Sequence, residues 1–210
     1  MELILIRHGE TDWNRETIFR GHIDIPLSEN GITQAEATAR ALRHKPIDAI
    51  YSSPLKRTMT TARTIAASHR IEPVAKDNYI DIDYGIWQGL TESIVKERYP
   101  RPFEKWTDHP EKMRFPNGES VRKVWKRCAS GLREIASTHD IETIVVVSHR
   151  IPIKLMTAFL LGKDTSAMNQ IKHDVCAISI FEIANRDFKP VLLNDNRHLS
   201  DLGIPALKDF

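Results

Sequence analysis

The stretch MELILIRHGETDWN, residues 1–14, decides how the rest of the chain is interpreted. Residues 3–6 form an apolar run rich in β-branched side chains, as in a strand buried on both faces of a parallel sheet. The run stops at Arg7-His8-Gly9, and open α/β sheets bind ligands at the carboxyl ends of such strands. The stretch therefore predicts a core strand ending at a ligand site, although an isolated Arg-His pair after a strand is more often a surface turn.

Two later segments repeat this arrangement. The run Thr143–Val147 reads TIVVV and ends at Ser148-His149, so a second buried strand also ends at a histidine. A short strand is predicted over residues 47–51, and the sequence SSPLKR follows it at residues 52–57. Ser53 suits a helix N-cap and Pro54 suits the first helical position, which places Arg57 in the first turn of a helix running to about residue 68.

The remaining segments predict helices that alternate with strands. Ser28 or Thr33 suits the N-cap of a helix to about residue 44, with Ile32 among the residues on its apolar face. An extended piece is expected within residues 73–83. The strongest helical periodicity follows Ser120, and its basic residues are interpreted as a solvated face; they are Arg122, Lys123, Lys126, Arg127 and Arg133. Two β-like runs, residues 177–183 and 190–194, precede an irregular tail.

Composition limits the functional classes. The chain has 210 residues, 41% hydrophobic and 28% charged, with a net charge of +2. We expect one domain over residues 1–210. The sequence has no block of basic residues typical of nucleic-acid binding, and no apolar run long enough to span a membrane. Cys128 and Cys176 are expected to be buried free thiols. With no signal-peptide pattern at the N-terminus, they favour a cytoplasmic protein.

Five polar residues follow a predicted strand or open the helix after one, and are expected to converge: Arg7, His8, Arg57, Asp81 and His149. A neutral imidazole can attack phosphorus. Guanidinium groups bind phosphate oxygens and neutralise transition-state charge, and a carboxylic acid can protonate the leaving oxygen. The set therefore predicts phosphoryl-transfer chemistry, and the scattered histidines show no metal-ligand spacing.

The motifs that surround these residues carry a family resemblance. Taken in order, they make the chain similar to the histidine phosphatase superfamily, also called the phosphoglycerate mutase-like family, over almost its whole length. The motifs are Arg7-His8-Gly9-Glu10-Thr11 with Asn14, Arg20-Gly21, Pro26-Leu27-Ser28, Ser52-Ser53-Pro54-Leu55-Lys56-Arg57, Gly85 to Gly89, Asn117-Gly118-Glu119-Ser120 and Val147-Ser148-His149.

The resemblance implies a fold, a set of catalytic residues and an activity. The fold is an α/β three-layer sandwich with a central, mainly parallel sheet flanked by helices. The activity is that of a phosphatase that needs no metal and no cofactor. His8 becomes a phosphohistidine, Arg7, Arg57 and His149 form the phosphate pocket, and Asp81, which precedes Tyr84-Gly85, serves as the general acid.

The resemblance also implies residues that contact substrate. Asn14 would add a contact to the phosphate, and Arg20, Gly21 and His22 would line the substrate side. Beyond these, Arg150 adds a cation at the rim, and the tail is expected to bring His198 over the opening. Three features depart from the family pattern: Asp81 replaces a more usual Glu, Arg150 a small residue, and Gln88 a common Glu.

Three functions remain open. The first is a phosphomonoesterase for a small metabolite, with phosphoserine as the first candidate substrate and α-ribazole phosphate as the second. Residues 145–162, and residues 192–194 with 198–199, are similar to metal-independent phosphoserine phosphatases. Tyr84 stands where those enzymes tend to have a histidine. The second is a phosphoglycerate mutase, which the short stretch between Asp81 and Pro116 disfavours. The third is a non-catalytic binding module. The expected partner is a small phosphoester, with no nucleic acid and no membrane, and a homodimer is left open.

Overall fold

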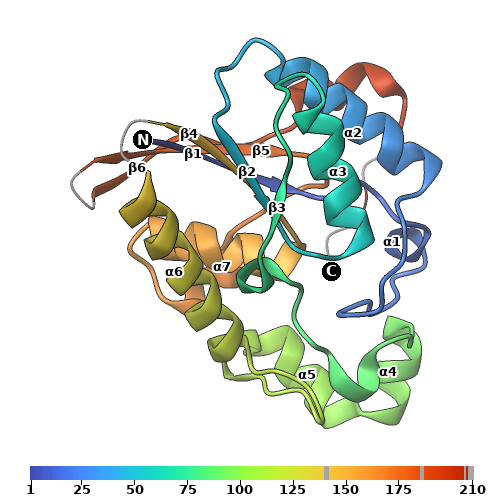
Figure 1. Ribbon diagram of the computed structural model, residues 1–210. Helices are drawn as coiled ribbons and strands as arrows, with labels where there is room; N and C mark the ends of the chain where they lie inside the picture. The colour runs from blue at the N-terminus through green and yellow to red at the C-terminus, as the bar shows by residue number, and fades with distance from the viewer. Residues whose placement is uncertain (140–141, 185–186, 206, 208–210) are drawn as a thin grey trace.

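The computed structural model describes residues 1–139, 142–184, 187–205 and 207. One six-stranded sheet lies between two layers of helices, with the strand order β3-β2-β4-β1-β5-β6 (Figure 1). The expected three-layer α/β sandwich is confirmed. The strands are β1 (Glu2–Arg7), β2 (Ala49–Ser52), β3 (Val74–Ala75), β4 (Thr143–Ser148), β5 (Ile178–Ala184) and β6 (Asp187–Asp195).

The four strands β3, β2, β4 and β1 run parallel, β5 pairs antiparallel with β1, and β6 pairs antiparallel with β5. β1 and β4 form the centre and pair residue by residue, from Glu2 opposite Thr143 to Arg7 opposite Ser148. Leu3, Ile4, Leu5 and Ile6 are fully buried, as the continuous apolar run predicts. Because the two strands are parallel and in register, their carboxyl ends lie side by side.

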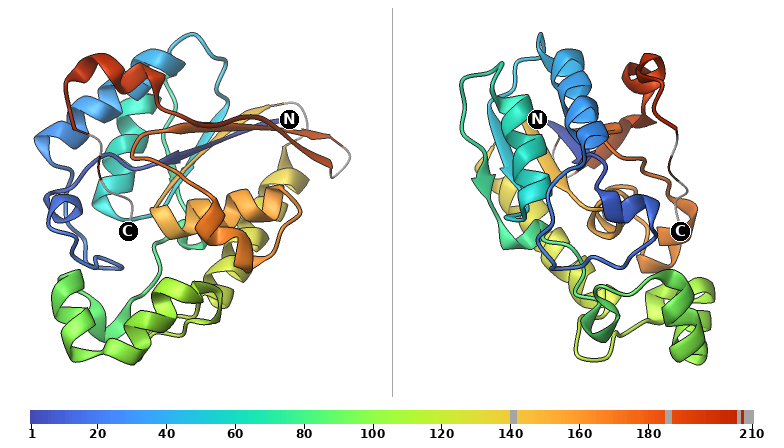
Figure 2. Two further views of the ribbon diagram at one scale, coloured as in Figure 1. Left: turned by 180° about the vertical axis from the view of Figure 1, so that it is seen from behind. Right: turned by 90° about the vertical axis from the view of Figure 1, so that its right-hand side faces the viewer.

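Seven α-helices are described, and the two longest pairs cover the two faces of the sheet (Figures 1 and 2). Ile4 and Ile6 pack into the core beneath α2 and α3, whereas Leu3 and Leu5 face the core shared with α6 and α7, because successive strand side chains point to opposite faces. The helices are α1 (Asp12–Arg15), α2 (Glu29–Leu42), α3 (Lys56–Ala66), α4 (Glu92–Arg98), α5 (Pro100–Asp108), α6 (Val121–Thr138) and α7 (Arg150–Leu160).

Short 3₁₀ helices occur in the connections, and α4 and α5 form an excursion beyond the carboxyl edge of the sheet (Figure 1). Trp106 of α5 packs edge-to-face on Phe115, with ring centroids 5.2 Å apart, and holds this excursion against the core. No helix in the described part of the chain combines the length and apolar character that crossing a membrane requires. The 3₁₀ helices are η1 (Asp77–Tyr79), η2 (Gly85–Trp87), η3 (Pro110–Lys112), η4 (Thr165–Gln170) and η5 (Arg197–Leu202).

Several boundaries differ from the sequence predictions. α3 begins at Lys56 with Leu55 as its N-cap, not after Ser53, and the Ser53 hydroxyl accepts from the amide of Leu55 at 3.4 Å in the turn before the helix. The extended piece expected within residues 73–83 is limited to β3, and residues 80–84 belong to no strand. Ile32 is 45% exposed, so its assignment to the apolar face of α2 is wrong. Part of the tail, expected to be irregular, forms η5.

Two glycines set how closely α2 approaches the end of β1. A Cβ on Gly9 would overlap the carbonyl oxygen of Gly31, and a Cβ on Gly31 would overlap the carbonyl oxygen of Glu10. Ser28 caps α2 by accepting a hydrogen bond from the amide of Gly31 at 3.2 Å. The backbone after β1 therefore packs directly against the first turn of α2, which is possible only because both residues lack side chains.

This contact predicts that Gly31→Ala is destabilising. Helix propensity alone predicts a gain of about 1 kcal/mol from this change, whereas overpacking costs about 1–3 kcal/mol. Since the obstructing atom is a backbone oxygen that cannot rotate away, we expect a net loss in the free energy of unfolding, measured by urea denaturation. Glu36→Ala, at an exposed position of the same helix, should change it by less than about 0.5 kcal/mol. A Gly31→Ala variant at least as stable as the wild type would contradict this packing.

Candidate active site

The two histidines predicted to converge lie next to each other. His8 continues the ladder one residue beyond β1, because its amide donates to the carbonyl of Ser148 at 3.0 Å. His149 follows Ser148 directly, so the register of β1 and β4 places the two imidazoles side by side. Their ring centroids are 5.1 Å apart, with the planes at 63°. The site is therefore a direct consequence of the central strand pairing.

His8 is held in one tautomer. Its Nδ1 lies 2.6 Å from the carbonyl oxygen of Gly9, which can only accept a hydrogen bond, so the proton is on Nδ1 and Nε2 carries a lone pair. Burial, together with the positive charges of Arg57, Arg20 and Arg7, holds the pKa of His8 well below its ordinary value. His8 is thus a neutral imidazole at physiological pH, the form that acts as a nucleophile.

His149 is held in the opposite tautomer. The Nε of Arg57 donates to His149 Nδ1 at 3.2 Å, and a guanidinium can only donate, so the proton of His149 is on Nε2. That Nε2 lies 2.7 Å from the Ser53 hydroxyl. Burial and the charge of Arg57 hold the pKa of His149 well below its ordinary value. His149 is therefore neutral, with its ring fixed between α3 and the end of β2.

Arg57 connects three parts of the site. It lies in the first turn of α3, as predicted, and is fully buried. Its Nη1 donates to the carbonyl of Ile23 at 2.9 Å and its Nη2 to that of Gly21 at 2.8 Å. Gly21 has a φ of +52°, which glycine adopts readily. Arg57 therefore fixes the loop that carries Arg20, Gly21 and His22 against the histidine pair.

Asp81 is the carboxylate that reaches this pair. Its Oδ2 lies 3.4 Å from Nη2 of Arg57 and 3.8 Å from Nδ1 of His149, and its Oδ1 accepts from the amide of Ile82 at 2.9 Å. The neighbouring Asp83 uses its carboxylate to accept from the amide of Gly85 at 2.8 Å. The two carboxylates thus serve different purposes, and the geometry favours Asp81 for chemistry at the histidines.

Arg7, Arg20 and Arg57 form a group of buried cations, called the arginine cluster below. Arg7 donates from Nη1 to the carbonyl of His173 at 2.9 Å. Among the described residues, the buried Nε and Nη1 of Arg20 have no hydrogen-bond partner. Burial and the like charges of Arg7 and Arg57 lower the pKa of Arg20 to about 9. Unpaired buried donors next to like charges are expected where an anion binds.

The other predicted contact residues are mostly used within the protein. Asn14 Oδ1 accepts hydrogen bonds from the amide and the hydroxyl of Thr11 at 2.9 and 2.8 Å. His22 Nε2 donates to the carbonyl of Asp81 at 2.9 Å, so its ring supports the Asp81 backbone. Arg150 is buried at the start of α7 and hydrogen-bonded to Tyr84. Arg20 was expected to line the substrate side of the site, whereas the structure buries it within the arginine cluster.

His198 does not lie over the opening. Its Nε2 is 3.1 Å from the hydroxyl of Thr38 and 3.1 Å from the carbonyl of Cys176, which ties η5 to α2. The geometry therefore gives His198 a structural contact and does not support its predicted role at the substrate. Other residues of the tail line a cavity that also includes Arg7.

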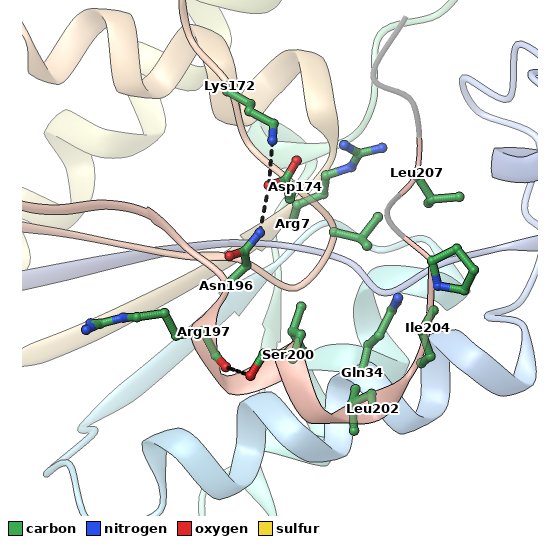
Figure 3. Close-up of a pocket in the computed structure, with 13 residues that line it drawn as sticks. Arg7, Gln34, Lys172, Asp174, Asn196, Arg197, Ser200, Leu202, Ile204 and Leu207 are labelled. Atoms are coloured by element: carbon green, nitrogen blue, oxygen red, sulfur yellow. Dashed lines mark hydrogen bonds and ion pairs between the residues drawn. The ribbon is translucent and has the colours of Figure 1, made fainter.

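A cavity of about 350 Å³ lies between the arginine cluster and the tail (Figure 3). Arg7 lines it and is shared with the cluster, while Lys172 and Asp174 form an ion pair of 3.1 Å on the same wall. Leu202 and Ile204 of the tail lie across from them. The cavity thus combines both signs of charge with an apolar wall and borders the arginine cluster through Arg7.

Sequence reasoning missed two residues that hold the site. Ser53 was assigned to a helix cap, whereas Leu55 is the N-cap of α3 and the Ser53 hydroxyl lies 2.7 Å from His149 Nε2. Arg127 was assigned to a solvated helix face and instead binds Glu119 and the backbone of the segment that carries Asp81. Its position at the edge of the apolar stripe of α6 was the available signal, since such positions are only partly exposed.

Comparison with known proteins gives consistent matches. The sequence model of the histidine phosphatase superfamily (branch 1) matches residues 3–196. The chain is 38% identical over 208 residues to phosphoserine phosphatase 1 of Hydrogenobacter thermophilus, covering 99% of each chain. Among solved structures, YhfR of Bacillus stearothermophilus superposes with a TM-score of 0.90 at 26% identity, covering 94% of this chain and 98% of that one. A phosphoserine phosphatase variant of Entamoeba histolytica, in complex with phosphoserine, superposes with a TM-score of 0.84 at 30% identity, with the same coverage.

The buried histidines predict how stability depends on pH. The unfolded chain protonates these histidines below about pH 6.5, whereas the lowered pKa values keep His8 and His149 neutral in the folded state. The unfolded state therefore binds more protons, and the free energy of unfolding should fall as pH is lowered from 7.5 to 5.5. The slope approaches about 1.4 kcal/mol per pH unit for each histidine. The free energy of unfolding, measured with urea at each pH, should depend less steeply on pH for His8→Asn than for the wild type. An equal dependence on pH would contradict the buried neutral state of His8.

Proposed function

The chain belongs to the histidine phosphatase superfamily and is a phosphatase for small phosphorylated metabolites, and we propose that it works through a phosphohistidine formed on His8. The observation that carries this proposal is the tautomer of His8. The Gly9 carbonyl accepts a hydrogen bond from the proton on Nδ1, which leaves the lone pair on Nε2 beside the arginine cluster. A nucleophile with a fixed lone pair and surrounding cations matches the needs of attack on a phosphate dianion.

The proposed reaction has two steps. In the first, His8 Nε2 forms a bond to phosphorus while the bond from phosphorus to the ester oxygen breaks, and Asp81 gives its proton to that oxygen. In the second, the Asp81 carboxylate takes a proton from a water molecule, whose oxygen bonds to phosphorus while the bond to His8 breaks. Inorganic phosphate leaves, and both side chains return to their starting forms.

The arginine cluster has a defined part in both steps. Arg20 offers two buried donors without partners among the described residues, and Arg7 and Arg57 add charge at the same place. In the transition state, negative charge on the phosphoryl oxygens is balanced by these guanidinium groups, as metal ions do in other phosphatases. His149, with its ring edge facing His8, completes the pocket. This arrangement supports catalysis without a metal.

The alternatives raised by the sequence are less well supported. A binding module on this fold would lack a catalytic group, whereas His8, Arg57, Asp81 and His149 all converge. A mutase needs to retain a bisphosphorylated intermediate, and the short excursion formed by α4 and α5 favours water as the acceptor. We also propose that residues 1–210 form one domain, supported by the match over residues 3–196. A cytoplasmic location is supported by the free, buried Cys128 and Cys176.

The nucleophile is tested by His8→Ala with p-nitrophenyl phosphate as substrate and EDTA present throughout. We expect the variant to lose at least about 10³-fold in kcat, as for removal of a nucleophile, and the wild type to keep its activity in EDTA. Thr33→Ala, at an exposed position of α2, is the control for handling and folding. Full activity of His8→Ala would overturn the mechanism, and loss of wild-type activity in EDTA that zinc or magnesium restores would overturn metal independence.

Phosphoserine is the proposed substrate. The relative from Hydrogenobacter thermophilus carries the name phosphoserine phosphatase, and the Entamoeba histolytica neighbour holds phosphoserine. The cavity of Figure 3 supports the proposal, because Lys172 and Asp174 offer a cation and an anion beside Arg7. An amino acid ester bound with its phosphate at His8 presents a carboxylate and an ammonium group, which these two side chains suit.

The preference is measured as kcat/KM for L-phosphoserine against phosphoethanolamine, which lacks the carboxylate. We expect phosphoserine to be preferred by about 10-fold or more, equal to about 1.4 kcal/mol. Lys172→Met should remove most of this preference and leave p-nitrophenyl phosphate hydrolysis unchanged, whereas Lys163→Met, an exposed lysine outside the cavity, should leave both unchanged. Equal kcat/KM values for the two esters would exclude phosphoserine as the preferred substrate, and α-ribazole phosphate would then be assayed as the next candidate.

A further inference from the structure

Arg127 of α6 uses every N–H group of its guanidinium within the protein. Its Nη1 donates to the carbonyls of Asn78 and Ile80 at 3.0 and 2.7 Å, and its Nη2 donates to the carbonyl of Asp81 at 2.8 Å. The remaining donors, on Nε and Nη2, reach the two carboxylate oxygens of Glu119 at 3.3 and 3.0 Å. A guanidinium has five such donors, so none is left for solvent or substrate.

Glu119 holds the other end of the same segment. Its Oε2 accepts from the amide of Asp83 at 3.2 Å, and its own amide donates to the carbonyl of Asp83 at 2.9 Å. The Arg127 and Glu119 side chains are only 17% and 8% exposed. Although burial opposes ionisation, the hydrogen bond and charge of Arg127 hold the pKa of Glu119 below its ordinary value. The pair is therefore a charged unit bound to both sides of Asp81.

This unit supplies hydrogen bonds that the backbone of the segment does not receive from a helix or a sheet, although the side chains of Ile82 and Tyr84 pack in the core. Residues 80–84 belong to no helix or strand, so their backbone groups are not fixed by a ladder. The carbonyl of Asp81 receives two hydrogen bonds, from Arg127 and from His22 Nε2, while the Asp81 carboxylate points to Arg57. The backbone of Asp81 is thus held from behind, and its carboxylate is directed at the reacting atoms.

We propose that Arg127, held by Glu119, is a positioning residue that keeps the Asp81 carboxyl within reach of the leaving-group oxygen. The proposal rests on the proposed function of Asp81 as the general acid. A general acid works only within hydrogen-bond reach of the oxygen it protonates, so small displacements of residue 81 slow the esters that need protonation most. Lysine can replace Arg127 only in part, because one ammonium cannot span Glu119 and three carbonyls.

The test compares two substrates with different leaving groups in five variants. The substrates are p-nitrophenyl phosphate, whose leaving group needs little protonation, and phosphoethanolamine, whose alkoxide needs much. For Arg127→Met we expect kcat/KM to fall by about 10-fold or more on phosphoethanolamine and by less than about 3-fold on p-nitrophenyl phosphate. Asp81→Asn should show the same pattern more strongly, and the double variant should lose no more than Asp81→Asn alone, since both act through one proton transfer.

Two further variants separate positioning from stability. Arg127→Lys should show a smaller loss with the same leaving-group dependence, and it replaces Arg127→Met should that variant not fold. Arg122→Met, an exposed arginine of the same helix, should leave both substrates and the melting temperature unchanged. An Arg127 variant that loses equally on the two esters, or whose loss adds fully to that of Asp81→Asn, would overturn the positioning role. If Asp81→Asn itself shows no leaving-group dependence, the proposed role of Asp81 as the general acid fails. Because this variant leaves Arg127 unchanged, that failure is distinct from a failure of the positioning role of Arg127.

Discussion

The in-register parallel pairing of β1 with β4 is the constraint on which the rest of the site depends. It places Arg7 opposite Ser148, and the amide of His8 then bonds the Ser148 carbonyl, so the residues after the two strands lie next to each other. β2 pairs with the other edge of β4 and brings Ser53 to His149. A shift of one residue in this register would turn the histidines to opposite faces of the sheet, and the site would not exist.

The pairing concentrates positive charge where water is excluded. Arg7, Arg20 and Arg57 surround two histidines that burial keeps neutral, with Asp81 as the carboxylate beside them. Buried charges of one sign are unfavourable unless a partner compensates them. In the proposed mechanism a phosphate dianion supplies that compensation, so the unfavourable burial of these cations favours binding of the phosphoryl group. Burial and the same positive charges keep the pKa of His8 low, as the proposed nucleophile requires.

Much of the fold and the centre of the site could be predicted from the sequence, because a buried parallel strand has a continuous apolar run that ends abruptly. β1 and β4 were found this way, together with His8 and His149. The position of Arg127 beside the apolar stripe of α6 indicates partial burial, but the segment that it binds and the depth of Arg20 could not be found. Helical periodicity predicts which residues face the core and not which loop lies against that face. The contact of His198 with Thr38 depends on how the tail packs on α2, which no local pattern encodes.

The account rests on one atom, Nε2 of His8, because the Gly9 carbonyl fixes the proton on Nδ1. The most direct measurement is to quench the enzyme with alkali during the first turnover of ³²P-labelled phosphoserine or p-nitrophenyl phosphate and to identify the phosphohistidine isomer in the labelled peptide. The account predicts label in the peptide that contains His8, attached at Nε2. Label attached at Nδ1 or on His149, or turnover with no label on any histidine, would contradict it.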